Sequence, residues 1–183
     1  MKSDEQLIAC YRDSGDGDAL EELVRRHIRR IRTVIGQMIV DQASADDLTQ
    51  EVFMRAFRSL ATFNGQARFT TWLYRIAMNT TYSFLDRQNR SPVDYRAELP
   101  EAVCTRNPAP EDVAVQTELQ SAIDLALGSL SPQLRAAIVL TSLQQMDIKE
   151  VAKIEGCTAA TIYWRIHQGR KQLKRLLRDY LQS

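Results

Sequence analysis

Apolar residues recur every three or four positions along most of this chain, which is the spacing of an amphipathic helix. The segment from Asp18 to about Val40 shows it most clearly, with Leu20, Val24, Ile28, Ile31, Ile35 and Met38. Further helices are expected near 4–13, from Ser44 past Leu60, from Thr70 to about Arg87, near 112–127, near 132–144, and on both sides of Gly156. Strand-like alternation is not evident, so the pattern predicts an all-α protein.

Several helix ends can be placed from local chemistry. Ser44, Thr70 and Thr158 each precede an apolar-periodic segment and can accept hydrogen bonds from its first backbone N–H groups. Asn64 and Gly65 form a turn-forming pair that is expected to separate two helices. These signals predict helix starts at or just after the three hydroxyl residues.

The helical periodicity stops between residues 91 and 117. This stretch holds four of the five prolines and five acidic residues against two basic ones. Repeated prolines cannot continue a helix, and the stretch is too long for an ordinary loop in a compact fold. We therefore predict two small helical domains, residues 1–90 and 118–183, joined by a flexible acidic linker at 91–117.

The last two helices have the spacing of a helix-turn-helix. Ala152 is small where the helices would cross, and Gly156 can adopt the left-handed backbone of the turn. At about 100° per residue, one apolar stripe forms on the second helix, made of Ile162, Ile166, Gly169, Leu173, Leu176 and Tyr180. Trp164 falls on the opposite side. It either packs under a neighbouring element or belongs to a surface that enters the major groove of DNA.

A second constellation lies in FTTWLYRIAMN at 69–79. Trp72, Arg75 and Asn79 recur at helical spacing on one face, and Arg68 precedes them in a loop. Aromatic rings stack on unpaired bases, with about 1–3 kcal/mol per base, and arginine binds phosphates. The segment therefore fits a single-strand-binding surface. The simpler alternative is that Trp72 belongs to the core and Arg75 is a solvated charge.

Composition narrows the functional classes. No apolar run approaches the roughly 20 residues of a membrane helix, and the acidic start lacks the order of a signal peptide, so we expect a cytoplasmic protein without membrane insertion. Three scattered cysteines and two histidines predict neither a metal site nor a disulfide framework. The net charge of +1 conceals two basic zones, with +3 over 51–100 and +5 over 151–183. Such asymmetry favours nucleic-acid contact.

Acidic residues gather at one helix start in ADDLTQEVF at 45–53. Asp47, Gln50, Glu51 and Met54 share the outer face of this helix, opposite its apolar stripe. Carboxylates at a helix start are usually caps, and no histidine lies nearby in the sequence. A protein-docking face is therefore favoured over a catalytic pair, and no catalytic residue is expected.

Taken in order, the motifs resemble those of a known family. DDLTQEVFMRAFRSLATFNGQARFTTWLYRIAMN, the acidic linker, and LSPQLRAAIVLTSLQQMDIKEVAKIEGCTAATIYWRIHQGRKQLKRLL are similar to bacterial RNA polymerase sigma factors of the extracytoplasmic-function (ECF) group in the sigma-70 family. The resemblance spans about residues 5–178. It implies an alternative sigma factor that binds core RNA polymerase and directs promoter-specific transcription initiation. It also implies no enzymatic activity, no cofactor and no small-molecule substrate.

The resemblance assigns three sets of residues. Those expected to dock on the β′ coiled coil of the polymerase are Asp47, Leu48, Gln50, Glu51 and Phe53. Those expected to melt the −10 element and capture a flipped base are Asn64, Arg68, Phe69, Trp72, Tyr74, Arg75 and Asn79. Those expected to read the −35 element are Thr161, Tyr163, Trp164, Arg165, His167, Gln168, Arg170 and Lys171. The linker would thread toward the polymerase active centre, the β flap is a further expected contact, and many relatives are held by an anti-sigma factor.

Departures from the family pattern leave the promoter sequence open. Tyr163 and Trp164 stand where relatives often carry a basic residue and a serine, and Gly169 stands where alanine is common. The alternative function is a stand-alone helix-turn-helix regulator that binds duplex DNA as a dimer. Such a regulator needs neither a single-strand pocket nor an acidic linker. A nucleic-acid enzyme or metal-dependent regulator would need a ligand cluster that the sequence lacks.

Overall fold

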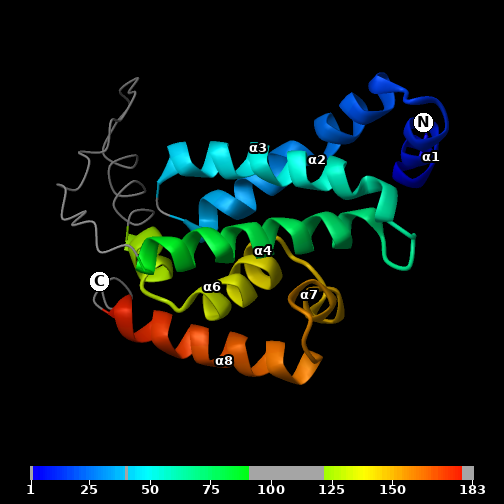
Figure 1. Ribbon diagram of the computed structural model, residues 1–183. Coiled ribbons are helices and arrows are strands. Elements are labelled where there is room, and N and C mark those ends of the chain that lie inside the picture. Colours follow the sequence, from blue (N-terminus) through cyan, green and yellow to red (C-terminus); the bar gives the residue numbers. More distant parts are fainter. Residues whose placement is uncertain (1, 40, 91–121, 179–183) are drawn as a thin grey trace, which may run out of the picture.

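The regular elements of the computed structural model are all helices in the residues that it describes, 2–39, 41–90 and 122–178 (Figure 1). They are α1 (Asp4–Ser14), α2 (Gly17–Met38), α3 (Gln42–Ser59), the 3₁₀ turn η1 (Leu60–Thr62), α4 (Phe69–Arg90), α6 (Pro132–Ile138), the π-helical turn η2 (Val139–Leu143), α7 (Ile148–Glu155) and α8 (Ala159–Leu176). Residues 122–128 are helical as well. The all-α prediction is confirmed. The linker predicted at 91–117 lies outside the described residues.

Two of the three predicted helix starts are wrong. α3 begins at Gln42, two residues before Ser44, because the Asp41 carboxylate accepts from the backbone N–H groups of Ala43 and Ser44 and caps the helix there. α4 already includes Thr70, since the helix begins at Phe69. Thr158 does cap α8, and its hydroxyl accepts from the Thr161 N–H at 3.1 Å.

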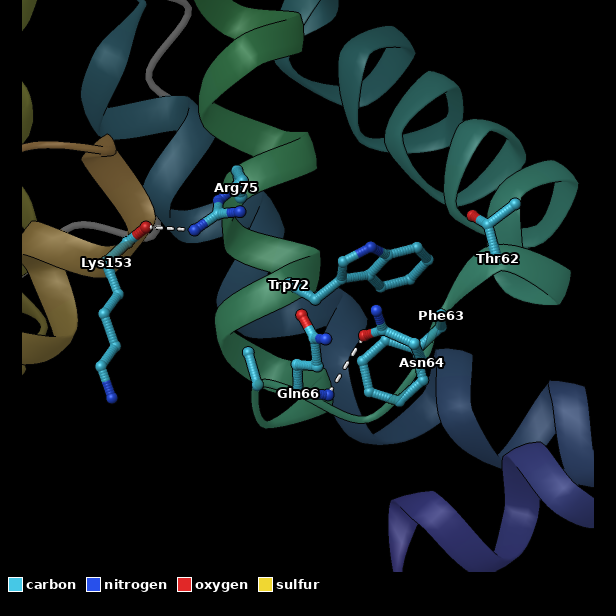
Figure 2. A pocket seen from close by; sticks show the side chains of 8 residues that line it. Thr62, Phe63, Asn64, Gln66, Trp72, Arg75 and Lys153 are labelled. Carbon is cyan, nitrogen blue, oxygen red and sulfur yellow. Dashed lines mark hydrogen bonds between the residues drawn. The ribbon is translucent and has the colours of Figure 1, made fainter.

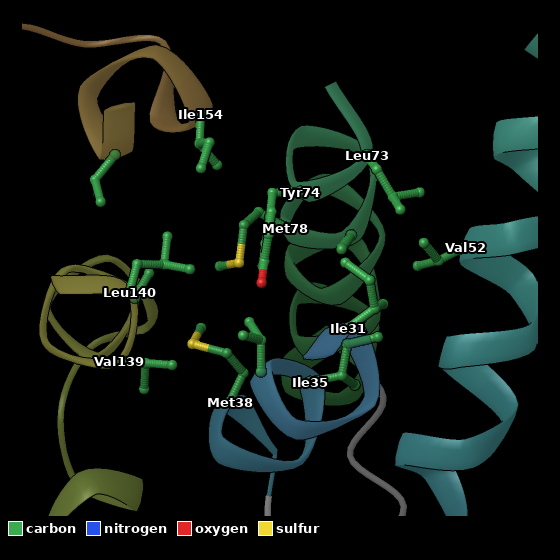
Figure 3. Packing of buried hydrophobic residues seen from close by; sticks show 14 of the residues in the cluster. Ile31, Ile35, Met38, Val52, Leu73, Tyr74, Met78, Val139, Leu140 and Ile154 are labelled. Atoms are coloured by element: carbon green, nitrogen blue, oxygen red, sulfur yellow. The ribbon is translucent and has the colours of Figure 1, made fainter. Parts of the chain in front are cut away.

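α4 lies at the centre of the fold. It packs against α2 and α3 on one side and against α6 and α7 on the other (Figure 1). Met38, Met78 and Leu140 belong to one continuous buried cluster to which both halves of the chain contribute. Figure 3 shows Leu140 facing the two methionines. Burial of each such side chain contributes about 1.5–3 kcal/mol, so the described helices of the two halves are held together by a shared apolar core.

Arg135 joins helix ends inside this core. Its residue is only 7% exposed. Its guanidinium donates to the carbonyls of Met38, at the end of α2, and of Gly128 and Leu130, at the end of helix 122–128. The last carbonyls of a helix have no partner within it, and a cation there also interacts favourably with the helix dipole. One side chain thus caps two helices. Burial disfavours the charged form of the Arg135 guanidinium and lowers its pKa.

Candidate nucleic-acid interface

The helix-turn-helix is formed by α7 and α8. Asp147 caps α7, and Gly156 ends it with a left-handed backbone, φ +64°. Ala152 and Ile162 are buried where the two helices pack. The local geometry predicted for the turn glycine and the small residue is therefore confirmed.

The outer face of α8 carries aromatic and basic side chains into solvent. Tyr163 is 62% exposed and Trp164 is 60% exposed. His167, Arg170 and Lys171 are exposed as well. The alternative that Trp164 packs under a neighbouring element is wrong in this structure. Two large aromatic rings are thus held in water on a helix rich in cations.

The apolar stripe of α8 is shorter than predicted. Ile162, Ile166 and Gly169 are buried, and Leu173 is half-buried. Leu176 is 42% exposed, because it is the last residue of α8. The helical wheel overestimated the stripe, since it assumes that a packing partner lies along the whole length of the helix. Tyr180 lies outside the described residues.

Arg165 differs from its neighbours on α8. Its Nη1 donates to Glu155 Oε2 at 2.8 Å, and its side chain is only 18% exposed. The Glu155 side chain is 3% exposed and also accepts from the Tyr82 hydroxyl at 2.9 Å. Burial raises the pKa of Glu155, against the effect of these two donors. In this conformation Arg165 is engaged within the protein, so it is not free to contact DNA.

The remaining two residues that are predicted to read the −35 element are less accessible than their neighbours. Thr161 and Gln168 are half-buried, and the Thr161 hydroxyl lies 2.9 Å from that of Thr158 at the start of the helix. The predicted −35 set therefore separates into five exposed side chains, two half-buried ones and Arg165.

A pocket of about 450 Å³ opens beside the start of α4 (Figure 2). Its lining residues are Thr62, Phe63, Asn64, Gln66, Ala67, Trp72, Arg75 and Lys153. The Phe63 and Trp72 ring centroids lie 5.2 Å apart, and Trp72 is only partly buried, so its ring borders the cavity. Asn64 Oδ1 accepts from the Gln66 N–H at 3.1 Å, which shapes the loop around the pocket.

Not all of the residues predicted to act on the −10 element lie at the surface. Asn64, Arg68, Arg75 and Asn79 are exposed. Phe69 is 1% exposed and packs edge-on against Phe63, with ring centroids 5.9 Å apart. Tyr74 is 7% exposed, and burial raises its pKa. Neither buried ring can contact DNA in this conformation, because both fill the space between α4 and its neighbours.

Arg12 of α1 holds the loop before this pocket. Its guanidinium donates to the carbonyls of Leu60, at 2.6 Å, of Ala61, at 3.2 Å, and of Phe63. These carbonyls follow the end of α3, where helical partners run out. The contacts of Arg12 could not be predicted from the sequence, because its partners lie 48–51 residues away and no local pattern reveals them.

The predicted polymerase-docking set divides between the surface and the core. Asp47 and Gln50 are exposed, Glu51 is half-buried and pairs with Arg55, and Met54 beside them is 53% exposed. Leu48 and Phe53 are 3% and 6% exposed, so they support α3 from inside. The outer face of α3 is therefore polar with one apolar residue at its centre.

Two observations on the described residues concern metal binding and membrane insertion. Over 2–39, 41–90 and 122–178, no group of three or more His, Cys, Asp or Glu side chains could hold a metal ion. Within the same ranges, no helix is long and apolar enough to cross a membrane.

Family comparison agrees with this arrangement. The family model described as Sigma-70 region 2 matches residues 23–91, and the one described as Sigma-70, region 4 matches residues 120–173. The first covers α3, α4 and the residues that line the pocket except Lys153, and the second covers α7 and most of α8. α1 and Arg12 lie before both matches.

Curated relatives narrow the class to one group. The ECF RNA polymerase sigma factor SigE of Mycolicibacterium smegmatis is 34% identical over 94% of this chain, which spans 66% of that relative. SigW of Bacillus subtilis is 31% identical over 90% of this chain and 92% of its own length, and the sigma-E factor of Escherichia coli K12 is 30% identical over 92% of each. The chain therefore belongs to the sigma-70 family of RNA polymerase sigma factors, in its ECF group. It is an alternative sigma factor that directs transcription initiation, and sigma factors are known as non-catalytic initiation factors.

Solved structures share the fold. CnrH, in complex with the cytosolic domain of CnrY, has a TM-score of 0.71 at 24% identity, with 97% of this chain and 99% of that chain covered. The sigma factor RpoE from Bartonella quintana, in complex with the anti-sigma factor NepR, has a TM-score of 0.67 at 24% identity, with 86% and 96% covered.

Proposed function

We propose that this sigma factor reads a promoter with two surfaces, one in each helical unit, residues 1–90 and 118–183. The pocket beside Trp72 would take the −10 element, and the outer face of α8 would take the −35 element. The observation that supports this most is the presence, on one chain, of an aromatic pocket next to Arg75 and of an exposed aromatic and basic helix face.

The −35 surface is proposed to consist of the exposed side chains of α8. These are Tyr163, Trp164, His167, Arg170 and Lys171. An α-helix fits the major groove, where base edges carry a distinct pattern for each pair. Aromatic rings can contact thymine methyl groups, while the cations bind phosphates. Arg165 would join them only if it leaves Glu155, and Thr161 and Gln168 would contribute at the edge.

The −10 surface is proposed to hold an unpaired base in the Trp72 pocket. A volume of about 450 Å³ lies within the range of roughly 300–1,000 Å³ found for small-molecule sites. Trp72 and Phe63 offer stacking surfaces, and the Asn64 and Gln66 amides can hydrogen-bond to base edges. The DNA backbone would be contacted by Arg68, Arg75 and Asn79. Phe69 and Tyr74 would support the pocket from within.

Core polymerase is proposed to bind the outer face of α3. Asp47, Gln50, Glu51 and Met54 offer polar and apolar contacts for the β′ coiled coil, with Leu48 and Phe53 as buried support. The C-terminal unit would meet the β flap, and the acidic linker would occupy a nucleic-acid channel. The protein would act in the bacterial cytoplasm, associated with the nucleoid when active. Because a structural neighbour is bound to an anti-sigma factor, an anti-sigma factor is a proposed partner here.

The decisive experiment combines purified chain, core RNA polymerase and promoter DNA. We expect a stable complex and promoter-dependent transcripts. Gln50→Ala with Met54→Ala should weaken polymerase binding, whereas Glu21→Ala, an exposed change on α2, should not. Absence of any complex with core polymerase would refute the proposal, and tight duplex binding by a dimer of the free chain would favour the stand-alone regulator.

A further inference from the structure

The pocket beside Trp72 takes its shape from a loop and three aromatic rings. The Trp72 ring lies close to those of Phe63 and Phe69, with centroids 5.2 and 5.6 Å apart. Figure 2 shows the Phe63 ring beside Trp72, at the loop that leads into α4. The position of the Trp72 ring, which is proposed to stack on a base, therefore depends on what holds Phe63 and Phe69 in place.

Phe63 is held from α1 by Arg12. The Arg12 guanidinium donates to the Phe63 carbonyl itself. It also donates to the carbonyls of Leu60, at 2.6 Å, and Ala61, at 3.2 Å. A guanidinium presents its donors in a rigid planar fork, so this one side chain sets the relative positions of three carbonyls. Arg12 thus fixes the part of the chain that carries Phe63 into the pocket.

Phe69 is supported from α1 through His27. The His27 ring packs edge-on against Phe69, with centroids 5.4 Å apart. His27 is only 9% exposed, and its Nε2 lies 2.7 Å from Asp4 Oδ2 of α1. Asp4 also accepts from Arg26 Nη1 at 3.0 Å. A buried polar network with its partners in place holds one arrangement of its side chains, so Asp4 fixes the ring edge that meets Phe69.

We propose that α1 positions the Trp72 pocket for base capture, with Arg12 as its main positioning residue. The Asp4–His27 pair is the second support. The inference rests on the proposed function, because it takes this pocket as the site of an unpaired base. It goes beyond that function, since α1 and Arg12 lie before the residues matched by the Sigma-70 region 2 model.

Arg12 acts through the loop and not by touching DNA. A site that is ordered before binding loses less conformational entropy when its ligand enters, so preorganisation raises affinity. α1 is a firm support because Leu7 and Ile8 are buried, at 5% and 2% exposure. Loss of the guanidinium should therefore leave α1 folded but loosen the loop. The cost falls on recognition of the base, while general contacts to the DNA backbone remain.

The test variant is Arg12→Gln, which removes the guanidinium fork. Its matched control is Arg58→Gln, because Arg58 is an exposed residue in the last turn of α3, just before the same loop. Both changes remove one positive charge from this part of the molecule. Arg12→Lys keeps the charge but presents its donors from a single point, so its effect should lie between wild type and Arg12→Gln.

The readout is a ratio of two affinities, measured on the complex of each chain with core RNA polymerase. The probe is a promoter fragment on which the wild-type complex initiates transcription, with its −10 non-template strand unpaired. An abasic site is moved along this strand, and the position where it weakens wild-type binding most marks the captured base.

Arg12→Gln should lower the ratio of base to abasic affinity at this position about five- to tenfold, because hydrogen bonds from a charged group near solvent lie at the weak end of their range. Arg58→Gln should leave the ratio unchanged. Hydrogen exchange in the free chain gives a second measurement. The amides of residues 63–68 should exchange faster in Arg12→Gln than in Arg58→Gln, whereas those of α1 should not.

The outcomes separate the inference from the proposed function. An equal ratio in Arg12→Gln and Arg58→Gln, or equal exchange at residues 63–68, would overturn the positioning role. An equal loss of affinity for base-containing and abasic DNA would overturn it too, because a direct phosphate contact or a general destabilisation does not depend on the base. A wild-type complex that is insensitive to an abasic site at every position would instead refute the pocket as the site of a base, and the inference with it.

Discussion

The double cap made by Arg135 gives a prediction that can be worked from the structure. Arg135→Met keeps a long apolar stem but leaves the carbonyls of Met38, Gly128 and Leu130 without their donor. A hydrogen bond to a charged group contributes about 1.5–3 kcal/mol, and three bonds from one guanidinium are not additive. The gain from no longer burying a charge opposes this loss, since burial already lowers the pKa of Arg135.

The net effect is expected to be a loss of about 2–4 kcal/mol in the free energy of unfolding. For a chain of 183 residues each kcal/mol shifts Tm by about 2–4 °C, so Tm should fall by roughly 4–16 °C. Urea unfolding followed by circular dichroism measures the free energy directly. Arg135→Lys should fall between wild type and Arg135→Met, because one ammonium keeps the charge but cannot reach three carbonyls.

Arg29→Met, an exposed change on α2, controls for the loss of a charge and should leave stability within about 0.5 kcal/mol of wild type. A loss below about 0.5 kcal/mol for Arg135→Met would refute the reasoning. It would mean that the three carbonyls regain water or that apolar packing replaces the cap in full.

Three further predictions follow from the helix-turn-helix. Trp164→Ala should weaken promoter binding in a filter or fluorescence assay yet leave Tm nearly unchanged, since the ring is 60% exposed; a large fall in Tm would show that the ring packs. Gly156→Ala should destabilise by about 1–2 kcal/mol in thermal unfolding because of the left-handed backbone, although no atom blocks a Cβ; an unchanged Tm would contradict this. Burial raises the pKa of Glu155, so the folded state binds the Glu155 proton more tightly than the unfolded state does. This proton binding stabilises the fold fully below the ordinary glutamate pKa, and the stabilisation is lost as pH rises through the raised pKa. The stability of Glu155→Gln relative to wild type should therefore increase with pH, and a pH-independent difference would exclude this titration.

Features governed by one helix were predictable from the sequence. The outward direction of Trp164 follows from 100° per residue, which does not depend on the rest of the fold. The Thr158 cap and the Gly156 turn depend on neighbouring backbone groups alone. The start of α3 shows the limit, because Asp41 and Ser44 are both good caps and the sequence does not say which one the backbone uses.

Features that depend on distant partners were not predictable. Arg165 was expected to read DNA because the resemblance assigned it to the −35 element, but its orientation is set by Glu155 and, through it, by Tyr82, which is 73 residues before Glu155. One feature of the sequence could have indicated that Glu155 pairs with a nearby cation. Glu155 is the single acidic residue between 151 and 178, and it directly precedes the turn glycine. The burial of Tyr74 was not predicted for a similar reason, since a helical wheel cannot show that α4 is covered on several sides.

The chain contains two tryptophans, and each lies on a different proposed DNA surface. Trp72 is partly enclosed, with the Phe63 and Phe69 ring centroids at 5.2 and 5.6 Å, whereas Trp164 stands largely in water. The indole at residue 72 should therefore emit at shorter wavelength than the indole at residue 164, and a base stacked on either ring should quench that ring alone. The two indoles would then act as separate optical reporters for the two proposed promoter surfaces, so the order in which these surfaces are engaged could be followed in the unlabelled chain.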